Sequence, residues 1–126
     1  TMNLLEMTVA KSGKNWVLSS EGCKFPIVGD GFSLQDGQKV VLGFRPSKLN
    51  VLSAASGAVV IASGVVDMVE FHGDDILLGI DYGSGRVMAF VDAFQAPREG
   101  AQVGFSLDEQ DMHLFDCETE QSLRKM

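Results

Sequence analysis

The stretch that decides the fold is GQKVVLGFRPSKLNV, residues 37–51. Within it, Val40, Leu42 and Phe44 alternate with Val41 and Gly43. Successive side chains of a strand point to opposite faces, so this alternation predicts a strand with one large apolar face. We therefore expect a strand over residues 39–45, packed on a core.

Pro46 ends that strand, because proline has no backbone N–H to donate to a sheet. Arg45 is then held at the end of the strand, where its fork of donors can bind a carboxylate or backbone carbonyls. We expect a structural corner, in which Arg45 is partly buried and hydrogen-bonded within the chain. The alternative is functional, with the arginine presented to a partner.

The same pattern returns later in the chain. Residues 37–44 resemble residues 100–107, GAQVGFSL, since each is a glycine turn followed by an alternating strand. A polar break follows in both, RPSK in the first and DEQD in the second, and then a short apolar return at residues 49–51 or 114–115. Two barrel-like halves of one chain would produce such a repeat, and chance similarity between strands is the alternative.

The rest of the chain is also typical of strands. The further segments with a strand-like pattern are residues 4–10, 16–20, 64–71, 76–82, 86–94 and 102–107. Short turns rich in Gly, Asp or Pro separate the later ones. No segment shows apolar residues at helical spacing over a helical length. Short strands at this spacing predict an all-β domain, either an antiparallel barrel or a sandwich.

Composition narrows the class of protein. A chain of 126 residues suits one domain with a real core. It carries 10 basic and 17 acidic residues, a formal net charge of −7. Nucleic-acid affinity depends on Lys and Arg neutralising phosphates, and the aromatic residues here do not alternate with basic ones, so we expect no nucleic-acid binding. Cys23 and Cys117 lack metal-site spacing, and we expect two free thiols.

Two segments bear on membranes. The first nine residues, TMNLLEMTV, lack a basic region followed by an apolar one, so we expect no signal peptide. Residues 49–66 carry no charge and approach the length of a membrane-spanning helix. They also contain Asn50, serines and glycines, so a loop followed by a strand explains them better. No direct membrane insertion is expected.

Catalytic motifs are missing from the sequence. There is no GxSxG nucleophile elbow, and residues 12–15, SGKN, lack the first glycine and the final Ser or Thr of a phosphate-binding loop. His72, Asp74 and Asp75 belong to an HGDD segment between two apolar strands, which we interpret as a turn rather than a metal site. We therefore expect no catalytic, cofactor-binding or metal site in this chain.

Several motifs resemble a known family. They are, in order, MNLLE at residues 2–6, VLGFRPSKL at 41–49, GVVDMVEFHGDDILL at 64–78, EGAQVGF at 99–105 and HLFDCET at 113–119. The second is similar to a Gly-Ile-Arg-Pro-Glu-His-Leu motif, and the last to a His-Leu-Phe-Asp-x-x-Thr-Gly ending. Together they resemble the C-terminal transport-associated OB (TOBE) domain of bacterial ABC importer ATP-binding subunits, most like the maltose and glycerol-phosphate type.

The resemblance spans residues 2–124, with two departures from the family pattern. Ser47 stands where Glu is usual, which loosens a contact of the Arg-Pro corner. Glu120 replaces a closing glycine, a residue suited to positive φ.

The resemblance implies an OB-like antiparallel β-barrel, or two interleaved barrel halves, forming one regulatory domain over residues 1–126. It implies a fragment of an importer's ATP-binding subunit that lacks the upstream ATPase domain. Its role would be regulation and dimerisation without catalysis, in an importer of sugars or related small organic solutes. Importers of polyamines, iron or sulfate carry related domains.

The same resemblance implies a homodimer that contacts the upstream ATPase domain and, indirectly, the membrane subunits. The parent protein would use ATP and Mg²⁺ and lie in the cytoplasm, at the inner face of the cell membrane. No cofactor is expected in this fragment. The candidate structural or interface residues are Arg45, Pro46, His113, Phe115 and Asp116. The leading alternative is a stand-alone OB-like barrel that binds a small anion or sugar, and an enzyme of unrecognised type comes third.

Overall fold

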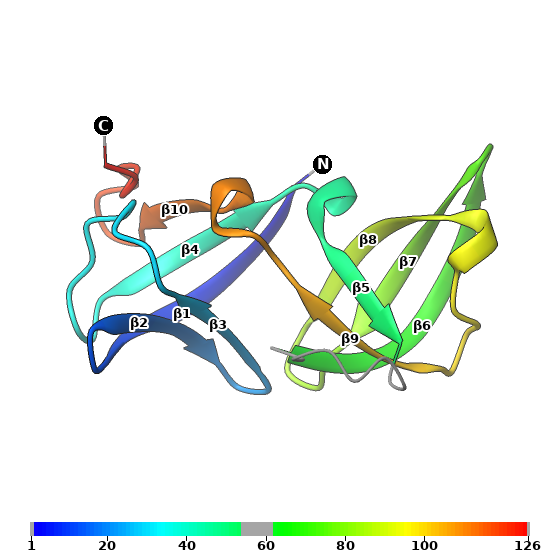
Figure 1. Cartoon of the computed structure of the whole chain (residues 1–126), viewed down its shortest axis with the longest axis horizontal. Helices are drawn as coiled ribbons and strands as arrows, with labels where there is room; N and C mark the ends of the chain where they lie inside the picture. Colours follow the sequence, from blue (N-terminus) through cyan, green and yellow to red (C-terminus); the bar gives the residue numbers. More distant parts are fainter. Residues whose placement is uncertain (1, 54–61, 126) are drawn as a thin grey trace.

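The computed structural model describes residues 2–53 and 62–125, and their regular secondary structure is mostly β-strand (Figure 1). The strands are β1 (Asn3–Ser12), β2 (Asn15–Ser20), β3 (Cys23–Ile27), β4 (Lys39–Phe44), β5 (Asn50–Ser53), β6 (Ala62–His72), β7 (Asp75–Asp81), β8 (Arg86–Asp92), β9 (Gln102–Ser106) and β10 (His113–Asp116). The described residues also form the short 3₁₀ helices η1 (Pro46–Lys48), η2 (Ala93–Gln95) and η3 (Glu109–Asp111). The all-β prediction is confirmed.

The described strands form two antiparallel lobes that exchange strands with each other. Lobe 1 has the order β10-β4-β1-β2-β3, and lobe 2 has the order β5-β9-β6-β7-β8. β5 follows β4 in sequence but pairs with β9 in lobe 2, whereas β10 follows β9 but pairs with β4 in lobe 1. Figure 1 shows both crossovers running between the lobes. The prediction of two interleaved barrel halves is therefore confirmed.

The exchange follows the internal repeat. Three consecutive elements each have a counterpart that begins 63 residues later: β4 at 39 and β9 at 102, η1 at 46 and η3 at 109, β5 at 50 and β10 at 113. The alternating strand of the sequence pattern is thus β4 or β9. The polar break is a 3₁₀ helix, η1 or η3, and the apolar return is the exchanged strand, β5 or β10. The repeat is structural, and chance similarity is not needed to explain it.

Strand alternation builds a core that is continuous between the lobes. Val40, Leu42 and Phe44 of β4 are fully buried, as the alternation predicted. Phe25 of lobe 1 and Phe105 of lobe 2 are also fully buried, and their ring centroids lie 6.2 Å apart. Burying one such side chain stabilises the fold by about 1.5–3 kcal/mol, so the two lobes are held together by the same effect that folds each of them.

Two predictions of local structure need correction. β3 was not predicted, because Pro26 interrupts its apolar run. The strand tolerates this proline because it joins β6 through a single residue pair, which leaves most of that edge without ladder hydrogen bonds. The predicted strand over residues 86–94 is two residues too long. β8 ends at Asp92, whose carboxylate accepts a 2.9 Å hydrogen bond from the Phe94 N–H and caps η2.

The uncharged stretch at residues 49–66 contains β5 and the start of β6, as a loop-and-strand reading requires, and its residues 54–61 lie outside the described part. Among the residues that the structure describes, no helix has the length and apolar character to cross a membrane.

Candidate functional site: the strand crossovers and the joint between the lobes

The first crossover turns at Arg45 and Pro46, as predicted. Pro46 begins η1, and the Lys48 N–H donates a 3.0 Å hydrogen bond to the Arg45 carbonyl. Because Phe44 points into the core, the extended backbone of the next residue directs its side chain outward. Arg45 is exposed, and its guanidinium has no hydrogen bond or ion pair with any residue that the structure describes. The expectation that Arg45 is partly buried is therefore wrong, and the described residues include no internal partner for its guanidinium.

The second crossover has the arginine contact that was expected at the first. The Glu109 carboxylate accepts hydrogen bonds from the backbone N–H groups of residues 28–29, both at 3.1 Å. The Arg124 guanidinium donates to the carbonyls of Glu109 and Met112, at 2.9 and 2.6 Å. It also lies 4.6 Å from the ring centroid of Phe32. Nothing near Arg124 in the sequence signals this role, because its partners are 12 or more residues away.

The other candidates lie on β10. His113 is exposed and Phe115 is half-buried. The Asp116 carboxylate accepts hydrogen bonds from the backbone N–H groups of residues 118–119, at 2.8 and 3.0 Å, and from the Gln38 side-chain amide at 2.8 Å. The Gln38 amide first, and then the backbone N–H groups, hold the pKa of the Asp116 carboxyl below its usual value. This carboxylate therefore organises the closing turn of the chain.

The closing turn explains one departure from the family pattern. Glu120 has φ +62°, in the left-handed region where the family has glycine. Its N–H donates a 2.8 Å hydrogen bond to the Asp116 carbonyl, which closes the turn. A residue other than glycine pays about 1–2 kcal/mol in that conformation, so the turn is strained relative to its glycine form.

The structure gathers the five candidate residues along one edge of lobe 1. β4 and β10 are adjacent and antiparallel, with His113 opposite Gly43 and Phe115 opposite Val41. Arg45 follows Gly43 by two residues. The candidates therefore share an edge and do not converge on a common cavity.

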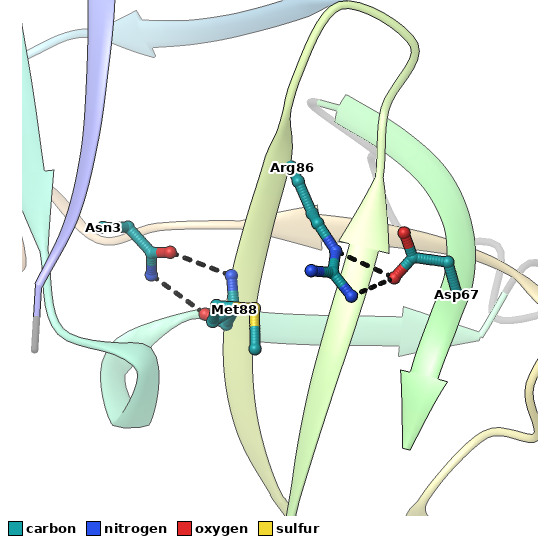
Figure 2. Close-up of polar contacts among 4 residues, drawn as sticks. All are labelled: Asn3, Asp67, Arg86 and Met88. Carbon is teal, nitrogen blue, oxygen red and sulfur yellow. Dashed lines mark hydrogen bonds and ion pairs between the residues drawn. The ribbon is translucent and has the colours of Figure 1, made fainter. Parts of the chain in front are cut away.

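Asn3 joins the lobes, a role that was not predicted. It is 9% exposed although its side chain is polar. Its amide N–H donates a 2.9 Å hydrogen bond to the Met88 carbonyl, and its oxygen accepts a 2.8 Å bond from the Met88 N–H (Figure 2). The side-chain amide of Asn3, on β1, thus bonds both backbone groups of Met88, on β8, as a neighbouring strand would. A second polar contact joins a turn of each lobe, where the Ser84 hydroxyl donates to the Glu21 carbonyl.

An ion pair lies on the outer face of lobe 2. The Arg86 guanidinium donates from two nitrogens to one oxygen of Asp67, at 3.0 and 2.8 Å (Figure 2). The pair lies over Gly79, where a Cβ would come within 2.7 Å of both charged groups. Both side chains are more than a third exposed, so the pair contributes about 1 kcal/mol at most.

The HGDD segment and the two cysteines are the remaining residues that were considered for chemistry. His72 pairs with Glu70 at 2.8 Å and stands opposite Asp75 across a two-residue turn, which confirms the turn predicted there. Among the described side chains, no group of three His, Cys, Asp or Glu could hold a metal ion. Both cysteines are free, as predicted. Burial raises the pKa of Cys23 to about 12, and burial followed by nearby carboxylates raises that of Cys117, so neither is a ready nucleophile.

Comparison with known proteins gives two family matches and a group of relatives. Residues 42–115 match the family model of the TOBE domain, and residues 1–49 match that of the MalK OB fold domain. The sn-glycerol-3-phosphate import ATP-binding protein UgpC of Salmonella paratyphi A (strain ATCC 9150 / SARB42) is 34% identical over 120 residues. UgpC of Escherichia coli (strain K12) is 32% identical over the same length. Each alignment covers 95% of this chain and 32% of the relative, so the chain spans about a third of these proteins.

A solved structure shares the fold. The cytoplasmic molybdate-binding protein ModG, with molybdate bound, superposes with a TM-score of 0.69 over 89% of this chain and 94% of its own. At 14% sequence identity this likeness concerns the fold alone. The TOBE match covers more than half of the chain and agrees with the order of motifs in the sequence. This chain belongs to the TOBE domain family.

Proposed function

We propose that this chain is the regulatory and dimerisation domain of the ATP-binding subunit of an ABC importer. The observation that carries the proposal is the match, over 95% of the chain, to the ATP-binding subunits of sn-glycerol-3-phosphate importers. The cargo would be a sugar or a related small organic solute such as a glycerol phosphate. The match to the MalK OB fold domain supports this class of importer.

The domain would act by contact and not by chemistry. Its described side chains include no metal cluster, and both of its thiols have raised pKa values. Its interleaved lobes share one core, which suits a rigid scaffold whose loops and edges meet other proteins. ATP and Mg²⁺ would be bound by a separate ATPase domain of the parent protein, at the cytoplasmic face of the membrane.

A chimera tests this proposal. The 120 residues of E. coli UgpC that align with this chain would be replaced by the chain, and sn-glycerol 3-phosphate uptake measured in cells that lack their own UgpC. We expect uptake well above that of cells carrying UgpC with the same segment deleted. Uptake no better than the deletion, with the chimera present at normal abundance, would refute the proposal. The isolated chain should also show no saturable ATP binding by calorimetry.

A further inference from the structure

One edge of β6 lacks a neighbouring strand along its outer half. On that side β9 pairs with residues 62–65. The last contact is at Val66, whose N–H donates to the Ala101 carbonyl at 2.9 Å and whose carbonyl accepts the Gly100 N–H at 2.7 Å. Residues 68–72 pair with β7 alone among the described strands, and Figure 1 shows this part of the β6–β7 hairpin projecting beyond β9. We call this side of residues 68–72 the open edge.

The register shows which backbone groups face the open edge. A two-residue turn joins β6 to β7, and in it Gly73 has the positive φ, 65°, that such turns need. His72 and Asp75, which flank the turn, therefore form a hydrogen-bonded pair, and bonded and non-bonded pairs alternate along an antiparallel ladder. Val69 and Phe71 then direct their N–H and carbonyl groups away from β7. No backbone group elsewhere in the described part of the chain pairs with them.

Exposed aromatic side chains lie at the same end of lobe 2. Phe71 is 75% exposed although it stands opposite Ile76, which is buried, so the row of side chains that lines the core continues into solvent here. Phe94, in η2, is 97% exposed. It is held near the hairpin turn, because the Ala93 N–H donates to the Asp74 carbonyl. Aromatic groups that are already ordered lose little entropy on binding a partner.

This end of lobe 2 is also acidic. Residues 67–75 and 92–99 hold six acidic residues, one arginine, Arg98, and one histidine, His72. His72 is paired with the first glutamate of the hairpin at 2.8 Å. Arg98 lies at the base of the hairpin, because its carbonyl accepts the N–H of Ala101, the residue that bonds β6 where the open edge begins. We call residues 67–75 and 92–99 the acidic end.

The carboxylates of the acidic end repel one another. Asp75 and Asp92 stand directly opposite each other on β7 and β8, and like charges in that position destabilise a sheet. The cation that β8 supplies, Arg86, is already paired with Asp67. A partner that brings further cations to this end would lessen the repulsion.

We infer that the open edge of β6 binds an extended, basic and apolar segment of a partner protein by strand addition. The N–H and carbonyl groups of Val69 and Phe71 bond the backbone of that segment, and its apolar side chains pack on the Phe71 ring. Its lysines or arginines face the acidic end. Main-chain bonds give affinity in this mode of recognition, and side chains give selectivity.

Charge decides what kind of segment fits. Two copies of this chain that paired through their open edges would bring their acidic ends together, and juxtaposed like charges disfavour association. A segment of opposite charge is attracted to the same surface. The inference concerns a surface of lobe 2, separate from the five candidate residues on lobe 1, and it does not depend on the cargo of the importer.

Peptide binding to this chain tests the inference. The probe is a fluorescent peptide of about six residues, the usual length of a strand, in which lysine and isoleucine alternate. We expect fluorescence anisotropy to give a dissociation constant of about 100 µM or tighter, weakened by added salt. One control peptide has glutamate in place of lysine, and another has every backbone nitrogen methylated so that it cannot donate to a strand. Both should bind at least about tenfold more weakly.

Substitutions at Phe71 separate the backbone contact from the side-chain contact. Phe71→Thr removes the ring and keeps the N–H, and it should weaken binding about threefold. Phe71→Pro also removes the N–H that faces the open edge while leaving the bonds to β7, and it should weaken binding at least about tenfold. Asp74→Asn/Asp75→Asn should weaken binding of the lysine peptide. The matched control is Leu4→Thr, a change at another exposed apolar strand residue, 64% exposed, which should leave the constant unchanged.

Amide hydrogen exchange of the unsubstituted chain locates the contact even where a variant fails to fold. The bound lysine peptide should slow exchange at Val69 and Phe71, whereas Glu70 and His72, whose amides face β7, should change little. Equal binding of the methylated peptide, or binding that leaves the Val69 and Phe71 amides unprotected, would overturn the inference. So would the absence of binding at about 1 mM peptide. Protection of the same two amides that grows with the concentration of the chain alone would also overturn it, because a second copy would then occupy the edge.

Discussion

Replacing Asn3 with alanine removes both hydrogen bonds that join β1 to β8. Each such bond contributes about 0.5–1.5 kcal/mol net, and the Met88 N–H and carbonyl would also lose their partner. Because Met88 is half-buried, water can replace part of what is lost. We therefore expect Asn3→Ala to lower the free energy of unfolding by about 2 kcal/mol, within the range for two neutral bonds. For a chain of this length the Tm should fall by about 6–10 °C.

Urea unfolding and calorimetry measure this loss, and amide hydrogen exchange locates it. The Met88 amide should exchange faster in the variant, whereas amides in the centre of lobe 1 should change only with global stability. Asn15→Ala is the control, since Asn15 is an exposed asparagine of β2, and it should stay within about 0.5 kcal/mol of the parent chain. An Asn3 variant as stable as this control, with the Met88 amide still protected, would refute the role assigned to the joint.

Three further outcomes are expected. Arg124→Ala should lower the free energy of unfolding by about 1–2 kcal/mol, and Arg45→Ala by less than about 0.5 kcal/mol, in urea titrations; equal losses would contradict the contacts described. Asp116→Asn should destabilise the chain at neutral pH but not in acid. The pKa of Asp116 is lower in the folded state than in the unfolded state. The stability that its carboxylate contributes is therefore present above the ordinary pKa of about 3.9, and it is lost as pH falls through the folded-state pKa. A stability difference between the two chains that persists in acid would count against this. Iodoacetamide at about pH 8 should label Cys117 before Cys23, which is 2% exposed, and mass spectrometry of the folded chain showing the reverse order would refute it.

Local patterns predicted the features that depend on neighbouring residues. The alternation of Val40, Leu42 and Phe44 identified a core strand, and Pro46 identified its end. The repeat of residues 37–51 indicated two barrel-like halves, but it did not predict that the halves exchange strands. These inferences needed only the period of a strand and the missing N–H of proline.

Features that depend on distant partners were missed. Arg45 and Arg124 cannot be told apart by their neighbours, and the contacts that decide between them lie on other elements. The role of Asn3 depends on a strand more than 80 residues away, although a polar residue beside an apolar run was a weak signal. The exposure of Phe71 and Phe94 was also missed, because an apolar residue in a strand-like pattern is expected to be buried.

The exchange of β5 and β10 has a consequence for synthesis on the ribosome. The first four strands of lobe 1 are complete by residue 44, but its fifth, β10, begins at residue 113. The edge of β4 at Gly43 therefore stays unpaired until His113, 70 positions later, has been synthesised. Pairs so far apart in the chain form slowly, because closing the intervening loop costs entropy first. A nascent chain interrupted before β10 leaves this edge of β4 open as a template for aggregation, whereas in the finished chain β10 covers it.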